Sequence, residues 1–262
     1  MQTQVFDALD AMEADDNVRV IIITGVGRAF CAGADMGMLS GAANKKGSSV
    51  YDTDEKGRSG KPSGMADRNV LYPTTILKPV IAAINGPVAG IGLALALGCD
   101  MRFAATDSKF LAAFSRRGLV AEYGSSWTLP NLVGTGNAML FLLSSDKFSG
   151  EEAMRLGIVQ RCFPKETLLD KTVEFAQHLA DKCSPVSLAA TKLQVWNHPT
   201  RSLTEALDES TELMGLTIGG DNDDFKEGVL SFVERRDPKF NPVSPQNVVV
   251  ARAKELLMRS KL

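Results

Sequence analysis

The stretch Lys78–Asp100, KPVIAAINGPVAGIGLALALGCD, constrains the fold most because its residue pattern changes abruptly at Asn85-Gly86. Residues 79–84 form an almost wholly apolar run with β-branched residues, which predicts a strand buried on both faces. Residues 90–98 alternate small residues with leucine, which predicts a buried helix packed closely against its neighbours. The sequence therefore predicts a strand that turns tightly into a buried helix.

Such a turn creates a potential site for an oxyanion. The first N–H groups of a helix have no partner within the helix, and the positive end of the helix dipole lies beside them. Gly86, Gly90 and Gly92 surround this point and would let a ligand approach the backbone. Glycines kept only for close helix packing explain this segment equally well.

A second cluster of accessible amides follows an earlier apolar run. Residues 18–24 (VRVIIIT) are typical of a central parallel strand, and the small residues 30–35 (FCAGAD) come after its end. Gly25-x-Gly27 after a strand also suggests a dinucleotide-binding turn. That motif needs a third glycine where Phe30 stands and a helix that begins there, and this sequence has neither.

Composition and charge exclude several classes of protein. The 262 residues, 44% hydrophobic and 23% charged, are enough for one domain with an appendage or for two small domains. The net charge of −2 argues against a nucleic-acid or anionic-membrane binder, so small molecules are the expected partners. No apolar run reaches the roughly 18 residues needed to span a bilayer. The four cysteines lack CxxC spacing and nearby histidines, which predicts reduced thiols and no metal site.

Two segments stand out between and after these clusters. Residues 40–67 are rich in Gly, Ser, Lys and Asp without apolar periodicity, which indicates either a lid over a site or a tolerated surface insertion. Residues 100–105 and 109–111 predict short strands. Glu122 then lies among apolar neighbours just before a predicted helix at 124–132, either as a functional carboxylate or as a charge at the helix terminus.

The remainder of the chain is predicted to be mostly helical. Ser149-x-x-Glu152 and Ser202-x-x-Glu205 are capping boxes, and Ser184-Pro185 and Ser244-Pro245 place proline at a first helical position. Two further amphipathic helices are expected between residues 203 and 236. The two histidines, His178 on the polar face of a helix after Pro164 and His198 in a loop, have no spacing that supports a Ser/His or Cys/His catalytic unit.

Five segments together resemble the crotonase (enoyl-CoA hydratase/isomerase) superfamily over nearly the whole chain: VRVIIITGVGRAFCAGADM (18–36), the stretch 78–105, FSRRGLVAEYGSSWTLPNLVG (114–134), FSGEEAMRLGIVQRCFP (148–164) and FVERRDPKF (232–240). The resemblance implies an α/β fold, with a spiral core of ββα units over 1–184 and a C-terminal helical trimerisation region over 185–262. It also implies acyl-CoA thioester substrates, trimers or hexamers, and no cofactor beyond the coenzyme A of the substrate.

The resemblance assigns roles to individual residues. The backbone amides of Ala34 and Ile91 would hold the thioester oxygen, in agreement with the two amide clusters. Ala32, Asp35, Met36 and Gly90 would contact the substrate. Glu122 matches the position at which peroxisomal-type Δ3,Δ2-enoyl-CoA isomerases keep a single acid/base, so the resemblance favours isomerisation of a 3-enoyl-CoA.

This sequence departs from the family pattern at three points. Relatives usually carry roughly 30 more residues before the position of Met1, which form opening strands of the sheet and whose absence would uncover a sheet edge. Ala94 and Phe114 stand where hydratases hold two glutamates. Ile91 replaces a frequent glycine, which would narrow the pocket. Weak hydration, another crotonase reaction, or non-catalytic binding of acyl-CoA or of a protein remain alternatives.

The sequence ends Ser260-Lys261-Leu262. A terminal Ser-Lys-Leu is a peroxisomal address in a eukaryote. It carries no such meaning in a bacterium, where the cytoplasm would be the expected compartment.

Overall fold

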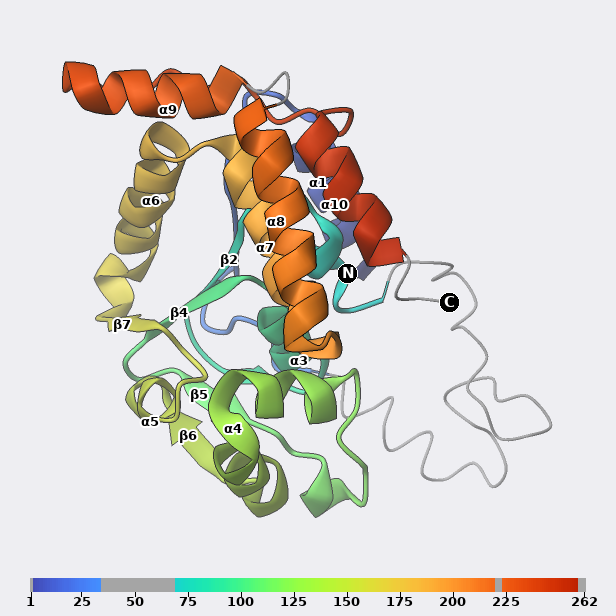
Figure 1. Ribbon diagram of the computed structural model, residues 1–262. Coiled ribbons are helices and arrows are strands. Elements are labelled where there is room, and N and C mark those ends of the chain that lie inside the picture. Colours follow the sequence, from blue (N-terminus) through green and yellow to red (C-terminus); the bar gives the residue numbers. More distant parts are fainter. Residues whose placement is uncertain (1, 34–68, 220–222, 259–262) are drawn as a thin grey trace.

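The computed structural model describes residues 2–33, 69–219 and 223–258 (Figure 1). Three expectations fall outside these residues: the contributions of Ala34, Asp35 and Met36, the lid at 40–67, and the terminal tripeptide. Within them, the fold has a central parallel sheet, a smaller sheet below it in Figure 1 and a helical region at the C-terminal end.

The central sheet has four parallel strands in the order β1-β2-β4-β7: β1 (Ile21–Thr24), β2 (Val80–Ile84), β4 (Met101–Ala105) and β7 (Arg161–Phe163). All five residues of β2 are buried, which confirms the predicted two-faced strand. The prediction for residues 18–24 was right in strand type but wrong in place. β1 pairs only with β2 among the described residues and lies at the sheet edge, where two of its isoleucines stay half-buried.

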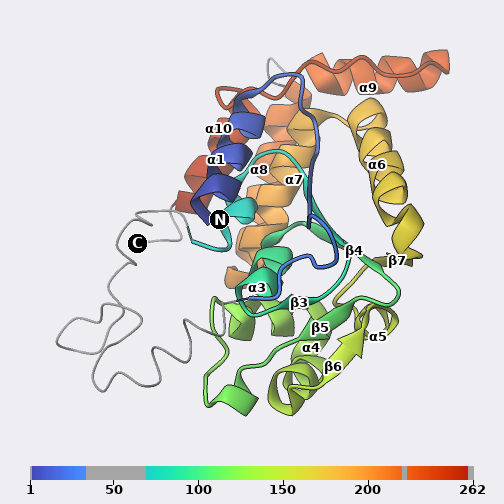
Figure 2. The same cartoon turned by 180° about the vertical axis from the view of Figure 1, so that it is seen from behind.

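Two groups of helices cover the two faces of this sheet. Ile81 and Ala83 of β2 pack with Phe103 of β4 against α6 (Lys165–Lys182). The alternate residues of β2 face a larger core that includes α1 (Gln2–Ala14) and α3 (Ile91–Gly98), which are seen together in Figure 2. The side chains of a strand alternate between faces, so one short apolar run serves both cores.

The smaller sheet contains β3 (Val88–Ala89), β5 (Lys109–Leu111) and β6 (Lys147–Ser149), with β3 parallel and β6 antiparallel to β5. It is flanked by α4 (Ser125–Ser144) and α5 (Gly150–Arg155). The predicted helix at 124–132 corresponds to the first part of α4, which a kink at Gly134 divides, where φ is 76° and ψ is 160°. Within the described ranges there are also three short 3-10 turns, at Tyr72–Thr75, Ser115–Arg117 and His198–Thr200.

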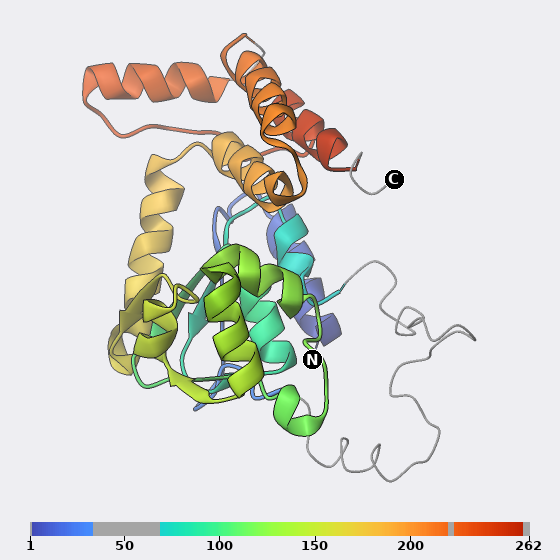
Figure 3. The ribbon, with the colours of Figure 1, turned by 60° about the horizontal axis from the view of Figure 1, so that its bottom comes forward.

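The C-terminal helices are α7 (Pro185–Asn197), α8 (Leu203–Gly219), α9 (Asp223–Glu234) and α10 (Val248–Met258). Helices α7, α8 and α10 share a second apolar core, whereas α9 extends outward from them (Figures 1 and 3). The capping boxes at Ser149 and Ser202 and the Ser184-Pro185 start are confirmed. The expected division at residue 184 stays a prediction.

The predicted helix start at Ser244-Pro245 is wrong. The Ser244 hydroxyl accepts a hydrogen bond from the Gln246 amide at 3.2 Å, within a separate turn. The helix begins at Val248, and the side chain of Asn247 accepts hydrogen bonds from the amides of Val249 and Val250 at 3.0 and 3.4 Å. Asparagine is as good an N-cap as serine, and the residue nearest the apolar run caps this helix.

Candidate functional site

The two amide clusters found in the sequence lie side by side. Cys31 pairs with Val88 in an isolated parallel bridge. The amides of Phe30 and Cys31 donate to the carbonyl of Pro87 at 3.1 and 3.2 Å, and the amide of Ala89 donates to the carbonyl of Cys31 at 2.9 Å. The segment after β1 therefore runs along the segment that enters α3.

Asn85 fixes this pairing from the end of β2. Its side-chain amide donates to the carbonyls of Gly25 and Gly27 at 2.9 and 3.1 Å, and its oxygen accepts from the amide of Gly25 at 3.2 Å. A Cβ on Gly86 would lie 2.1 Å from the carbonyl oxygen of Arg28, so only glycine fits there. The Asn85-Gly86 pair thus joins the turn after β2 to the turn after β1.

Glycines bring the backbones together at the start of α3. Gly90 has φ 53° and ψ −124°, a conformation that strains any residue with a Cβ. A Cβ on Gly90 would lie 3.7 Å from the Cα of Gly33, and one on Gly92 would lie 2.4 Å from the Cβ and carbonyl oxygen of Cys31. Close packing therefore requires glycine at position 92, as the helix-packing interpretation of the sequence predicted. The same packing aligns the two amide segments.

Ile91 occupies the first position of α3, where its amide has no acceptor within the helix. The amide of Ala94 is the first to be satisfied, by the carbonyl of Gly90 at 3.1 Å. The expected second donor, Ala34, lies one residue beyond the described segment that ends at Gly33. Of the expected substrate contacts, Gly90 and the exposed Ala32 lie at this point.

Glu122 lies in the loop between the Ser115–Arg117 turn and α4. Tyr123 and Gly124 have φ values of 56° and 74°. The amide and hydroxyl of Ser125 both donate to the carbonyl of Glu122, at 3.0 and 2.7 Å. The side chain is half-buried, and burial alone raises the pKa of its carboxyl group above the ordinary glutamate value. In contrast, hydrogen bonds at a capping box lower the pKa of Glu152.

The loop that carries Glu122 adjoins α3. Leu71 lies between this loop and α3. A Cβ on Gly124 would lie 3.1 Å from the Leu71 side chain, and a Cβ on Gly98 would lie 3.2 Å from the Leu71 Cα. Gly98 is at the end of α3 opposite to Ile91. Helices α3 and α4 also pack directly. No hydrogen bond joins the Glu122 carboxylate to either amide segment within the described part of the chain.

The two positions where hydratases would hold glutamates lie inside the apolar core. Ala94 is 1% exposed and Phe114 is 5% exposed, and both belong to the main core cluster. No carboxylate stands at either place. Glu122 is the acidic side chain that the sequence resemblance singles out for the reaction, and it lies two residues before Gly124, which adjoins Leu71.

Sequence reasoning missed Asn85 as the residue that joins the two turns. Its signal was an Asn-Gly pair directly after a buried strand, which was interpreted only as a break in periodicity. The four cysteines form no disulfide, as predicted. Among the described residues, no helix combines the length and apolar character needed to cross a lipid bilayer.

Comparison with known proteins gives a consistent family. Residues 1–242 match the family model described as "Enoyl-CoA hydratase/isomerase". A 1,2-epoxyphenylacetyl-CoA isomerase of Escherichia coli is 35% identical over 92% of this chain and 87% of its own length. A probable enoyl-CoA hydratase of Mycobacterium bovis is 34% identical over 89% of this chain and 80% of its own.

Solved structures agree with the sequence relatives. A probable enoyl-CoA hydratase/isomerase from Mycobacterium abscessus superposes with a TM-score of 0.76 at 28% identity, over 92% of this chain and 88% of that one. The α/β fold with a helical C-terminal region is therefore that of the crotonase enzymes, as the sequence resemblance implied.

Proposed function

Because the chain belongs to the enoyl-CoA hydratase/isomerase family, we propose that it moves the double bond of a 3-enoyl-CoA to position 2, with Glu122 as the single acid/base. The observation that carries this proposal is the contrast between one half-buried carboxylate with a raised pKa and the apolar residues at both hydratase positions. The Escherichia coli relative is named an isomerase of an epoxide acyl-CoA, which supports isomerisation of an acyl-CoA as the class of reaction.

The chemistry follows from these groups. The Glu122 carboxylate removes a proton from C2 of the 3-enoyl thioester, and the electrons of that C–H bond delocalise onto the thioester oxygen and C4. The amide of Ile91, together with the expected amide of Ala34, donates to the developing enolate oxygen. The carboxyl group of Glu122 then returns the proton to C4, which leaves the double bond between C2 and C3.

A raised pKa suits a group that takes and returns a proton. An ordinary glutamate is a weak base and removes a proton slowly from a carbon that is only weakly acidic. Partial burial makes the carboxylate more basic, and it stabilises the protonated form that exists between the two steps. The same half-buried position therefore serves both halves of the reaction.

The proposal requires the Glu122 carboxylate to reach a thioester whose oxygen lies at the start of α3. Ile91 and Gly98 are separated by about 10 Å along the helix axis. Glu122 belongs to the tight turn before α4, in which Tyr123 and Gly124 have positive φ and the amide of Ser125 donates to the carbonyl of Glu122 at 3.0 Å.

Hydration is the alternative that one observation favours, since the Mycobacterium bovis relative bears a hydratase name. Hydration in this family's usual pattern needs two glutamates to position and activate water. Because Ala94 and Phe114 supply none, we give isomerisation precedence.

Glu122→Gln tests the proposal. The variant should lower kcat for 3-enoyl-CoA isomerisation by about 10²–10⁴-fold or more while changing the dissociation constant of an acyl-CoA less than threefold, because the amides are untouched. Glu151→Gln, a change at an exposed glutamate in the first turn of α5, is the matched control and should behave as wild type. A variant that loses both turnover and binding would show that Glu122 is a structural charge at the start of α4.

A further inference from the structure

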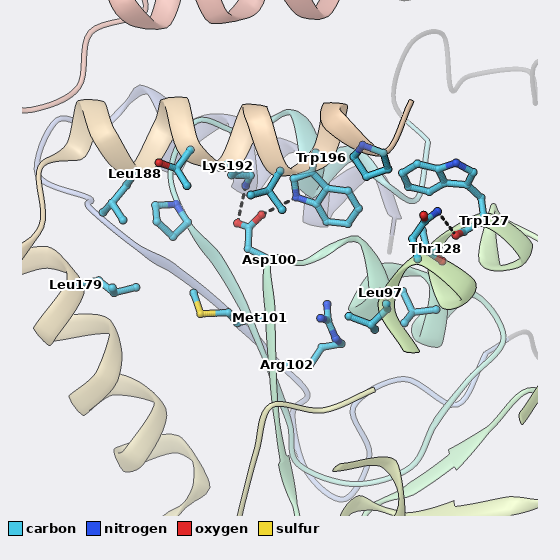
Figure 4. A pocket seen from close by; sticks show the side chains of 16 residues that line it. Leu97, Asp100, Met101, Arg102, Trp127, Thr128, Leu179, Leu188, Lys192 and Trp196 are labelled. Atoms are coloured by element: carbon cyan, nitrogen blue, oxygen red, sulfur yellow. Dashed lines mark hydrogen bonds and ion pairs between the residues drawn. The ribbon is translucent and has the colours of Figure 1, made fainter. Parts of the chain in front are cut away.

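A cavity lies apart from the candidate site. It has a volume of about 510 Å³ and is bounded by α4, α7 and the start of β4 (Figure 4). Neither Ile91 nor Glu122 lines it. It meets α3 at Leu97, about 9 Å along the helix axis from Ile91. Both tryptophans of the chain, Trp127 and Trp196, form part of its wall.

The wall of this tryptophan-lined cavity is mainly apolar. Leu97, Met101, Leu179 and Leu188 line it together with the two indole rings, and Figure 4 shows these side chains around one space. Trp127 at 39% and Val195 at 65% are exposed apolar residues that line this cavity. An apolar occupant would cover both of them.

The charged groups of the cavity have their partners within the protein. Asp100 accepts from the indole N–H of Trp196 at 2.9 Å, from the amide of Val80 at 2.7 Å and from the ammonium of Lys192 at 2.7 Å. Lys192 donates its other two protons to the carbonyls of Pro73 and Lys78, at 2.8 and 3.0 Å.

Arg102 is bound in the same way. Its guanidinium donates to the carbonyls of Ile158 and Cys99, at 2.8 and 2.7 Å, and to the side chain of Gln160. Because these three charges are already satisfied, none of them is available to recognise a polar ligand. The cavity therefore favours an apolar ligand over a polar one.

We propose that the tryptophan-lined cavity binds the hydrocarbon chain of a fatty-acid-like amphiphile, separately from the acyl-CoA site. The volume lies within the range of small-molecule pockets. The exposed side chains of Thr191 and Asn131 at the cavity leave the polar head of such a molecule in contact with water. A long chain would cover the exposed faces of Trp127 and Val195.

The placement of the tryptophans makes a direct test possible, because all indole fluorescence of the protein comes from this cavity. Titration of the full chain with decanoic acid below its micelle concentration should change the emission in a saturable way. Decanedioic acid, which has the same chain length but a charge at both ends, should give at least tenfold weaker binding. A saturating acyl-CoA should change the apparent Kd of decanoic acid less than twofold.

Two exposed valines provide matched variants. Val195→Asp places a charge at the cavity and should weaken decanoic acid binding at least tenfold, whereas Val26→Asp, at a fully exposed valine in the loop after β1, should not. The proposal is overturned if emission does not change up to the solubility limit, if both acids bind equally, or if both variants bind like wild type. A further result would also overturn it: Val195→Asp alone dissociates an oligomer, and the emission of wild type does not change with decanoic acid. A second copy of the chain would then cover the cavity.

Discussion

At the scale of single residues, the account depends on the protonation of Glu122. Only the ionised carboxylate can remove a proton from C2, and burial raises the pKa of this group above its ordinary value of 4.5. The protonated, inactive form therefore persists to a higher pH than it would for an exposed glutamate. The same shift favours the protonated form in the folded state, so Glu122 contributes stability at low pH that is lost as pH rises through its folded pKa.

The pH dependence of kcat/KM checks this point. For wild type with a 3-enoyl-CoA, kcat/KM should rise with pH to a plateau, and the midpoint of the acid limb should lie above 4.5. Circular dichroism at each pH provides the control that the protein stays folded. A profile that is flat down to pH 4 in folded protein would show that another group acts as the base.

At the scale of secondary-structure elements, Gly92 aligns α3 with the segment that ends at Gly33. Alanine at this position would place its Cβ 2.4 Å from atoms of Cys31, so one segment must move. Overpacking of this kind costs about 1–3 kcal/mol. We expect Gly92→Ala to lower the free energy of unfolding by that amount and kcat at least tenfold, because the amide of Ile91 shifts with its helix.

Gly136→Ala is the matched control for this change. Gly136 lies within α4, and a Cβ there would meet no atom within 4 Å. Alanine is about 0.5–1 kcal/mol more favourable than glycine in a helix, so this variant should be slightly more stable with unchanged kcat. Full activity in Gly92→Ala would contradict the role of the close packing. Chemical denaturation and steady-state kinetics on both variants give the two quantities.

How far the sequence predicted the structure differed from element to element. The strand at 79–84 and the helix after Gly90 were predictable because one change of apolar pattern separates them. The edge position of β1 was not, because its apolar run reads like that of a central strand and pairing depends on distant residues. The Asn85 contacts with Gly25 and Gly27 also join residues about sixty positions apart, which no local pattern encodes.

The same limit applies to the charged residues. Lys192 and Asp100 form an ion pair that ties α7 to the sheet, with side chains 4% and 15% exposed, yet the sequence analysis singled out neither of them. Conversely, Glu122 was singled out because its immediate neighbours are apolar, and its side chain is half-buried in the structure. Local apolar context is thus a usable signal for burial, whereas pairing across the fold is not.

At the scale of the whole molecule, we propose that the chain assembles into a trimer or hexamer. Helix α9 extends from the core and carries apolar side chains in solvent, with Phe225 43%, Phe232 84% and Val233 70% exposed. Exposed apolar surface of this kind marks contacts with other protein chains. Light scattering at micromolar concentration should therefore give at least three times the mass of one chain.

A charge on this helix tests the same idea. Phe232→Asp should lower the average mass, whereas Val26→Asp, at an exposed valine in the loop after β1, should leave it unchanged. A wild-type protein that is folded and monomeric under these conditions would rule out the proposed assembly.

The central claim, that Glu122 makes this protein an isomerase rather than a hydratase, is tested most directly by measuring both reactions on one preparation. For wild type, kcat/KM for conversion of a 3-enoyl-CoA to the 2-enoyl-CoA should exceed kcat/KM for hydration of the 2-enoyl-CoA at least about 100-fold, because the positions of the hydratase glutamates are apolar. Glu122→Gln should remove the faster reaction. Rapid hydration by wild type that survives in Glu122→Gln would contradict the account.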